Sequence, residues 1–355
     1  MASNGRGISI AATATAVPPH EVTREVVKAY LGQVFPLEGA RLDAMMTIVD
    51  NSQVKRRYCI HPVEYTIQPR PLSQISQEYQ EHAVKLGRQV ACESLTKAGM
   101  QPTDIDLIVT VSCTGVMIPS LDAHLINDLG FRSDVRRLPI TELGCAAGAA
   151  ALSRAWEFLR GFPEASVLVV AVELPSLTFQ RDNFSQANLI SSVLFGDGAA
   201  AVVVTGRGGH GPRILDTESY LFPESLDAMG FDLKETGLHI VLSKDVPQMI
   251  REKIKGLVTN FLKRSKLDQG QIAHFLLHPG GQKLLLYMEE ELGLQRADTQ
   301  LSWKVLSEYG NLSSASVFFV LDDCLTNQKP ASGEYGLLAS FGPGFSAEMV
   351  LLQWT

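Results

Sequence analysis

The 355-residue sequence has few charges, few cysteines and no long hydrophobic run. Charged residues make up 19% of the chain and the formal net charge is −7, a balance that argues against a nucleic-acid partner. The five cysteines are scattered without CxxC spacing, which argues against a disulfide framework and a zinc site and predicts a reducing compartment. No cluster of metal ligands stands out, so we expect no bound metal.

The sequence also lacks the patterns of a membrane span and of a secretion signal. No apolar run approaches the roughly 18 residues that a transmembrane helix needs. The first residues, MASNGRGISI, have no basic segment followed by a long apolar one, so we expect no signal peptide. With 45% hydrophobic residues, the composition predicts a globular, cytoplasmic protein about two domains in size.

Similar elements are expected twice along the chain, in the same order. A buried strand at 106–112 is followed by a small-residue helix after Cys145 and by the apolar strand 165–173. Beyond the glycine-rich segment 206–213, a strand, a helix and a strand are again expected, at 272–277, 313–327 and 335–341.

This repeated order predicts a duplicated α/β fold, with two mixed sheets packed around central helices. We place the N-terminal half at 1–206 and the C-terminal half at 214–355. The glycine-rich segment between them is the clearest linker of the chain.

Cys145 is the first candidate for chemistry. It lies between Gly144 and the run AAGAA, which leads into a helix with Leu152, Trp156 and Leu159 at helical spacing. The backbone N–H groups at the start of a helix favour a thiolate, and small residues let the backbone approach a substrate. A structural cysteine in a packing helix is an equal alternative, since free cysteine is often buried.

Three loops of the second half supply possible partners for this cysteine. His278 ends an apolar strand before Pro-Gly-Gly, at a rim where ligands bind in α/β folds, although a packed core histidine has the same pattern. Asn311 lies at a loop-to-helix junction, where it also suits a helix N-cap. The residues Gly342, Pro343 and Gly344 predict a hairpin turn whose backbone N–H groups face a cavity, or an ordinary β-turn.

The four motifs GCAAG, HPGG, EYGNLSSAS and GPG are much stronger together than separately. With them, the sequence resembles the type III polyketide synthases, the chalcone/stilbene synthase superfamily, over essentially its whole length. Further matching segments are VKRRY at 54–58, LFGDGAAA at 194–201, LSKDVP at 242–247, LLHPGG at 276–281 and LSEYGNLSSASV at 306–317. The resemblance implies a thiolase-like αβαβα fold and a homodimer.

The resemblance also implies a mechanism in which Cys145, His278 and Asn311 are the catalytic triad. Cys145 would attack an acyl-CoA thioester and carry the acyl group. His278 and Asn311 would donate hydrogen bonds to the thioester oxygen of malonyl-CoA and stabilise the enolate left when CO₂ departs. The N–H of Cys145 and the turn at 340–344 would form the second oxyanion hole. The family needs no metal and no organic cofactor.

Substrate specificity is expected in the cavity walls. The family's two aromatic gate positions fall on Phe195, which is retained, and on Ile240, where plant members have phenylalanine. The position that plant chalcone synthases keep as glycine falls on Phe231, whose ring should fill elongation or cyclisation space. The remaining positions that match cavity-lining residues are Cys113, Thr114, Thr178 and Ser313. Some bacterial members that accept long acyl chains carry a similar Cys-Thr pair beside an acyl tunnel.

Two further expectations concern the surface. Ile118 matches the family's residue that enters the partner subunit's cavity, although ordinary packing explains it equally well. Basic residues near the CoA entrance, Lys55, Arg56 and Lys283, are candidate CoA contacts by proximity only. Because the region 44–51 is uncharged apart from one aspartate, an acyl carrier protein stays an alternative donor.

The leading hypothesis is a type III polyketide synthase that extends a fatty acyl-CoA starter with malonyl-CoA to alkylpyrones or alkylresorcinols. One alternative is a ketoacyl synthase of the kind that initiates fatty-acid synthesis, with a single condensation. Another is a polyketide synthase with an aromatic or short starter. A non-catalytic scaffold of the same fold is a third, but such a homologue usually lacks at least one triad residue.

Overall fold

The computed structural model describes residues 7–35 and 38–355. The expectation about a signal peptide rests partly on residues 1–6, which lie outside the described residues. Nine strands form one sheet in the order β11-β12-β13-β8-β1-β7-β6-β4-β5, and two further pairs, β9–β10 and β2–β3, lie apart from it.

The N-terminal half contributes strands β1 (Ser9–Ala16), β2 (His20–Thr23), β3 (Arg56–Cys59), β4 (Leu107–Val111), β5 (Arg136–Ile140), β6 (Ser166–Glu173) and β7 (Gly198–Thr205). Its helices are α1 (Arg24–Val34), α2 (Ala40–Asn51), α3 (Val63–Thr66), α4 (Leu72–Ala98), α5 (Leu121–Leu129), α6 (Ala147–Gly161) and α7 (Gln186–Leu194).

The C-terminal half contributes strands β8 (Arg213–Leu221), β9 (Met229–Lys234), β10 (Gly237–Leu242), β11 (Ile272–Leu277), β12 (Tyr335–Gly342) and β13 (Ser346–Gln353). Its helices are α8 (Val246–Arg264), α9 (Gln282–Leu292), α10 (Gln300–Tyr309) and α11 (Ser316–Asp323).

Each half has its own mixed sheet, and the two sheets meet at a short seam. In the first half β4 runs parallel to β5 and β6, while β7 and β1 run antiparallel to their neighbours. In the second, β11 and β12 are parallel and β13 is antiparallel to both β12 and β8. The seam is the pairing of Ser9 with Arg213, so the two expected sheets are continuous at one edge.

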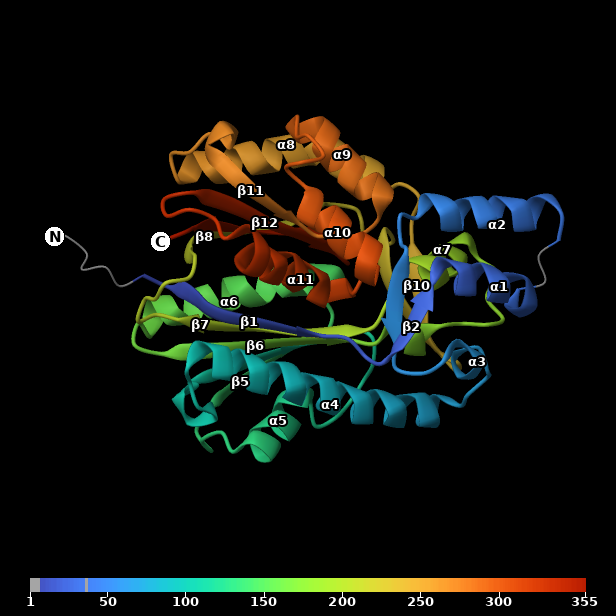
Figure 1. Cartoon of the computed structure of the whole chain (residues 1–355), viewed down its shortest axis with the longest axis horizontal. Coiled ribbons are helices and arrows are strands. Elements are labelled where there is room, and N and C mark those ends of the chain that lie inside the picture. Colours follow the sequence, from blue (N-terminus) through green and yellow to red (C-terminus); the bar gives the residue numbers. More distant parts are fainter. Residues whose placement is uncertain (1–6, 36–37) are drawn as a thin grey trace.

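The helices form layers above, between and below the sheets. Helices α8 and α9 cover the outer face of the second sheet, and α4 and α5 cover that of the first (Figure 1). Helices α6 and α11 lie between the sheets, so the order is αβαβα, as expected (Figure 1).

Small residues let the two central segments approach each other. A Cβ added to Gly148 of α6 would lie 2.3 Å from the carbonyl oxygen of Ser314, which is too close for any side chain. Ser314 belongs to the 3₁₀ turn Ser313–Ala315, which leads into α11. The small residues of the run AAGAA after Cys145 therefore allow this close backbone contact. The contact brings α6, from the N-terminal half, next to the turn before α11, from the C-terminal half.

Some elements differ from the expectation. The predicted helix at 313–327 consists of the turn Ser313–Ala315, α11 and a π-helical turn at Cys324–Gln328. Strand β8 and the hairpin β9–β10 carry alternating or polar residues and were not predicted. The hairpin is half-buried and stands beside α7, over the pocket described below.

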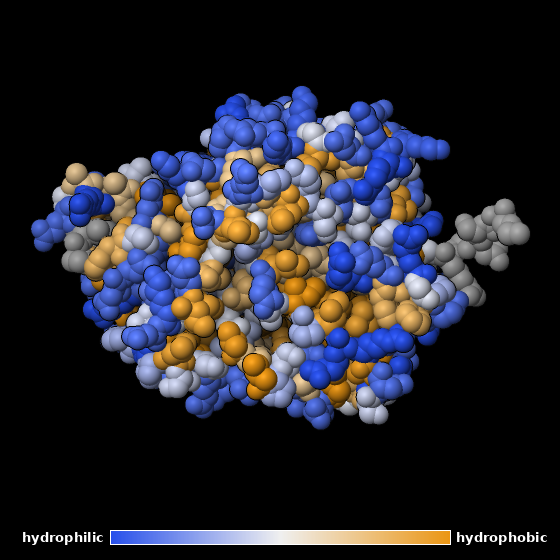
Figure 2. Space-filling model, turned by 180° about the vertical axis from the view of Figure 1, so that it is seen from behind, coloured by the Kyte–Doolittle hydropathy of each residue, from blue (hydrophilic) through white to orange (hydrophobic). Residues whose placement is uncertain are grey.

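No helix within 7–35 and 38–355 is long and apolar enough to cross a bilayer. On the face opposite to that of Figure 1, hydrophobic side chains gather in patches between polar ones (Figure 2). Among the most exposed large hydrophobic residues of the molecule are Ile118, Leu226 and Leu233.

Candidate active site

Cys145 lies in the 3₁₀ turn Gly144–Ala146, directly before α6, and its side chain is buried. Gly144 has φ +48°, and a Cβ there would lie 2.5 Å from Cδ of Pro343. A Cβ on Gly342 would lie 2.4 Å from the carbonyl oxygen of Leu143. The hairpin turn between β12 and β13 thus packs directly against the cysteine loop, and both glycines are needed for the contact.

His278 and Asn311 come from the second half. His278 follows β11 and is 2% exposed. Its backbone N–H donates to the carbonyl oxygen of Ala339 at 2.8 Å and fixes the position of the residue. Its Nδ1 has no hydrogen-bond partner among the described residues. Asn311 pairs with Phe195 in an isolated parallel bridge, so the two residues are tied to each other through their backbones.

A chain of contacts joins these residues to Cys145. The Sγ of Cys145 lies 3.4 Å from the Oγ of Ser313. The N–H of Ser313 donates to Oδ1 of Asn311 at 2.8 Å, and Nδ2 of Asn311 donates to the carbonyl oxygen of Gly280 at 3.3 Å. Gly280 in turn donates its N–H to the carbonyl oxygen of His278. These contacts connect the loops that carry Cys145, His278 and Asn311, and of the three only Cys145 is among the residues that line the cavity described below.

The side-chain oxygen of Asn311 is engaged within its own loop. It accepts hydrogen bonds from the N–H of Ser313 and from the Oγ of Ser316, as in a local turn. The N-cap positions are instead Leu312, before the turn Ser313–Ala315, and Ala315, before α11. The alternative in which Asn311 is a helix N-cap is therefore wrong.

Burial keeps both proton-carrying groups of the site neutral. It raises the pKa of the Cys145 thiol to about 12, although hydrogen bonding with Ser313 and Asn311 opposes the rise. Burial lowers the pKa of His278 to about 3. The thiolate expected from the helix start is therefore wrong, because desolvation outweighs the helix terminus.

A cavity of about 1120 Å³, open solvent at its mouth included, begins at Cys145. It contains the predicted residues Cys113, Thr114, Cys145, Thr178, Phe195, Phe231, Ile240, Ser313 and Pro343. Phe231 and Ile240 are direct cross-strand partners in the β9–β10 hairpin. The two positions expected to control the gate and the cavity volume therefore form one wall.

Beyond these residues, the cavity extends over apolar side chains from the first half. They come from β2, α1, α3 and the segment before α7: Val22, Val27, Tyr30, Leu31, Val34, Phe35, Val63, Ile67 and Phe179. None of these residues was named from the sequence, although those of α1 recur at the spacing of one helix face.

A buried carboxylate supports the cavity floor at Cys113. Glu173 ends β6, is fully buried, and accepts the N–H of Cys113 at 3.1 Å and the hydroxyl of Thr114 at 2.9 Å. It also accepts the hydroxyl of Ser314. Burial raises the pKa of Glu173. An acidic residue at the end of the fully apolar strand 165–173 was the signal that sequence reasoning passed over.

The candidate CoA contacts lie apart from the cavity. Arg56 forms ion pairs with Glu21 and Glu308, and together with Lys55 it lines a separate surface depression. Lys283 is exposed on α9. The basic residue of this stretch that does line the cavity is Arg57, which the sequence analysis did not single out.

Ile118 lies away from the cavity in the same chain, and its side chain is 93% exposed. The described residues contain no group of histidine, cysteine and acidic side chains that could hold a metal ion.

Models of a known protein family match nearly the whole chain. The N-terminal domain model of the chalcone and stilbene synthases matches residues 1–208, and the C-terminal domain model matches residues 214–354. A 1,3,6,8-tetrahydroxynaphthalene synthase of Streptomyces peucetius subsp. caesius is 37% identical, over 98% of this chain and 94% of its own length. A phloroglucinol synthase of Pseudomonas fluorescens is 35% identical, over 95% of this chain and 97% of its own.

Solved structures of polyketide synthases superpose closely on this chain. The 1,3,6,8-tetrahydroxynaphthalene synthase of Streptomyces coelicolor, a bacterial type III polyketide synthase, superposes with a TM-score of 0.95 at 35% identity. The match covers 98% of this chain and 99% of that one. A synthase from the brown alga Ectocarpus siliculosus superposes with a TM-score of 0.92 at 29% identity, over the whole of both chains. The predicted thiolase-like fold is confirmed.

Proposed function

The chain belongs to the chalcone and stilbene synthases, the type III polyketide synthases, and on this basis we propose that it extends a fatty acyl starter held on Cys145. The family are acyltransferases that catalyse decarboxylative Claisen condensation. The observation that carries the proposal is the mainly apolar cavity that begins at Cys145 and is lined by side chains of β2, α1 and α3. An alkyl chain is the substrate part that gains most from leaving water for such a wall.

The first step of the proposed reaction loads the starter. The thiol of Cys145 attacks the carbonyl carbon of an acyl-CoA while the neutral imidazole of His278 accepts its proton. A C–S bond forms at Cys145, the C–S bond to CoA breaks, and the proton passes to the leaving CoA thiolate. A histidine whose pKa is depressed by burial is in the neutral, proton-accepting form throughout the neutral pH range.

The second step joins the extender. Malonyl-CoA binds with its thioester oxygen near His278 and Asn311, whose N–H groups donate to it. The carboxylate leaves as CO₂ and its bonding electrons form an enolate on the thioester. The enolate carbon attacks the acyl-cysteine carbonyl, so a C–C bond forms and the Cys145 thiolate is released. The lengthened chain is now a CoA thioester, and Cys145 attacks it as in the first step and releases CoA. Repetition of the two steps lengthens the chain by two carbons each time before cyclisation to an alkylpyrone or alkylresorcinol.

The wall made by Phe231 and Ile240 supports a fatty acyl starter. Phe231 takes up space that a cyclising aromatic tetraketide would need, whereas an alkyl chain can turn toward the apolar side chains of α1. We propose that Cys113, Thr114, Thr178 and Ser313 shape the floor, and that Phe195 is the gate.

A second candidate follows from the relatives. A tetrahydroxynaphthalene synthase and a phloroglucinol synthase, whose names describe hydroxylated aromatic products, are 37% and 35% identical to this chain. This similarity favours a short starter such as malonyl-CoA itself. The same triad serves both candidates, and only the cavity walls decide between them.

The proposal also includes the role of each half of the chain and the oligomeric state. The half 1–206 supplies the nucleophile, and the half 214–355 supplies His278 and Asn311. We expect a homodimer, which the exposed Ile118 side chain and the apolar patches of Figure 2 support, since exposed apolar patches mark interfaces. CoA thioesters are the substrates, and an acyl carrier protein is an alternative donor. We expect no cofactor.

Incubation with acyl-CoAs of two to twenty carbons, each with malonyl-CoA, tests the proposal. Products are identified by mass, and malonyl-CoA alone is the reference. Products whose mass increases with the chain length of a C8–C16 starter are expected. If aromatic products form from malonyl-CoA alone and long starters are not incorporated, the second candidate replaces the first.

A further inference from the structure

The cavity that begins at Cys145 has one charged residue in its wall. Among the described residues that line it, Arg57 alone carries a full charge, and the rest are apolar, hydroxyl, thiol or glycine residues. A cation in a neutral cavity is costly unless something pairs with it. The charge of Arg57 in this cavity therefore requires a partner of opposite charge.

Strand geometry directs the Arg57 side chain to the cavity. In β3 successive side chains point to opposite faces, so Arg57 and Cys59 share one face and Arg56 and Tyr58 share the other. Arg57 and Cys59 both line the cavity, whereas Arg56 forms ion pairs with surface carboxylates. The cross-strand partner of Arg57 on β2, Val22, also lines the cavity.

The guanidinium lacks the partner that it would be expected to have. Its Nε and Nη1 atoms are buried and have no hydrogen-bond partner among the described residues. The buried carboxylate of Asp197 is near enough to act on the charge of Arg57, but it forms no hydrogen bond with Nε or Nη1 and accepts three hydrogen bonds from other groups. Its oxygens accept the N–H of Ile60 at 2.9 Å, the N–H of Ser176 at 2.8 Å and the hydroxyl of Ser176 at 2.5 Å.

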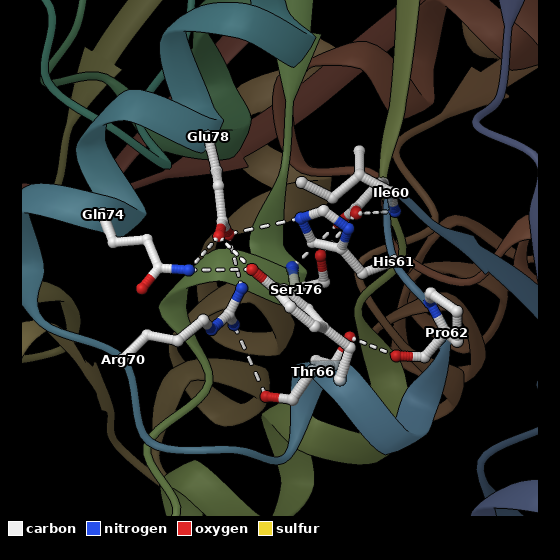
Figure 3. A network of polar contacts seen from close by, with 10 residues as sticks. Ile60, His61, Pro62, Thr66, Arg70, Gln74, Glu78 and Ser176 are labelled. Atoms are coloured by element: carbon white, nitrogen blue, oxygen red, sulfur yellow. Dashed lines mark hydrogen bonds and ion pairs between the residues drawn. The ribbon is translucent and has the colours of Figure 1, made fainter.

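A polar network holds this segment in place. Glu78 of α4 accepts hydrogen bonds from Tyr65 at 2.6 Å, Arg70 at 2.5 Å and Gln74 at 2.9 Å, and lies 3.2 Å from His61 (Figure 3). The contacts of Ile60 and Ser176 lie next to it (Figure 3). Asp197 also donates its N–H to the carbonyl oxygen of Tyr58 at 2.8 Å. The end of β3 is thus fixed from two sides.

The stem of Arg57 lies beside the catalytic loops. A Cβ added to Gly196 would lie 3.0 Å from the Cβ of Arg57, and one added to Gly310 would lie 3.6 Å from it. Gly196 follows the gate residue Phe195, and Gly310 precedes Asn311. The stem of Arg57 therefore lies beside the loops that carry Phe195 and Asn311, the residue proposed to bind the thioester oxygen of the extender.

We propose that Arg57 binds the free carboxylate of malonyl-CoA, before that carboxylate leaves as CO₂. This rests on the proposed function, in which malonyl-CoA is the extender. A single methylene separates the carboxylate of a malonyl thioester from its carbonyl, so a thioester held at Asn311 places the carboxylate close by. A guanidinium forms strong, charge-assisted hydrogen bonds with carboxylates, and its planar fork suits two oxygens.

The proposed contact is specific to the ground state. Decarboxylation converts the anionic carboxylate into neutral CO₂, so the interaction with Arg57 is lost as the transition state is reached. Such an interaction lowers the KM for malonyl-CoA and does not raise kcat. A starter without a free carboxylate gains nothing from it.

Steady-state kinetics of Arg57→Gln and Arg57→Lys test the assignment, with octanoyl-CoA saturating and malonyl-CoA varied. Loss of a charged hydrogen bond predicts that Arg57→Gln raises the KM for malonyl-CoA about tenfold or more, with kcat not reduced. Arg57→Lys keeps the charge and should fall between. Arg88→Gln, on the exposed surface of α4, is the matched control. A parallel series with malonyl-CoA alone separates its starter role from its extender role.

Two further readouts exclude a purely structural role. Acylation of Arg57→Gln by octanoyl-CoA without malonyl-CoA should proceed at the wild-type rate, and its melting temperature should not fall. An unchanged KM for malonyl-CoA overturns the assignment, as does a lower melting temperature with slower acylation, which would make Arg57 a structural counter-charge to Asp197. If the wild-type protein condenses no malonyl-CoA at all, the proposed function fails together with this inference.

Discussion

Lowering the pH from 7 to 5 should destabilise the folded protein by about 2 kcal/mol through His278 alone. The ring is 2% exposed, and burial lowers its pKa to about 3. A histidine in an unfolded chain titrates near pH 6.5, so between about pH 6.5 and 3 the unfolded state binds the extra proton. Stability contributed by the neutral ring is therefore complete above this window and falls as the pH falls through it.

The magnitude follows from the width of the window that is crossed. From pH 6.5 to pH 5 is about 1.5 pH units, and each unit is worth about 1.4 kcal/mol. Urea unfolding of wild type and His278→Gln at pH 7 and pH 5, at one protein concentration, isolates this contribution. Other titrating groups, such as Asp197, whose pKa burial raises to about 6, occur in both proteins and cancel in the difference.

The expected result is that wild type loses about 2 kcal/mol more than His278→Gln over this pH change. His278→Asn provides a second comparison if the glutamine variant folds poorly. An equal loss in wild type and variants would show that the histidine is accessible to protons in the folded state. The neutral imidazole in the proposed loading step would then have to be abandoned.

Two further predictions concern the cavity wall and the central helices. Phe231→Gly should give longer or differently cyclised products by mass, because the ring bounds the cavity; an unaltered product profile would contradict its place in the wall. Gly148→Ala should cost about 1–3 kcal/mol in urea unfolding, because its Cβ would lie 2.3 Å from the Ser314 carbonyl oxygen. Gly161→Ala, where a Cβ meets no atom within 4 Å, is the control, and equal stability of the two variants would refute the packing argument.

The strands were predictable where the sequence contains a short run of mainly apolar residues. The strands 165–173 and 272–277 are such runs, and β6 and β11 occupy them almost residue for residue. Strand β8 and the β9–β10 hairpin were missed because their side chains are only partly buried and their polar residues mimic a loop. The position of β8 depends on pairing with β1 and β13, which are distant in sequence, and the local pattern does not contain this information.

The candidate site was predictable where function requires a motif. Cys145, His278 and Asn311 stand in motifs of the family, and contacts in the structure connect the loops that carry them, although their roles remain proposals. Arg57 was missed because its importance comes from a missing partner, and only the distribution of hydrogen bonds around Asp197 makes this visible. The charge state of Cys145 was mispredicted because the sequence shows the helix start but not the degree of burial.

The most direct test of the account is the site of acylation. Wild-type protein incubated with octanoyl-CoA should gain one octanoyl group by intact mass, and peptide mapping should place it on Cys145. Cys145→Ala should gain none, although Cys113 still lines the same cavity. An adduct on another residue, or one that persists in Cys145→Ala, would contradict the claim that Cys145 is the nucleophile.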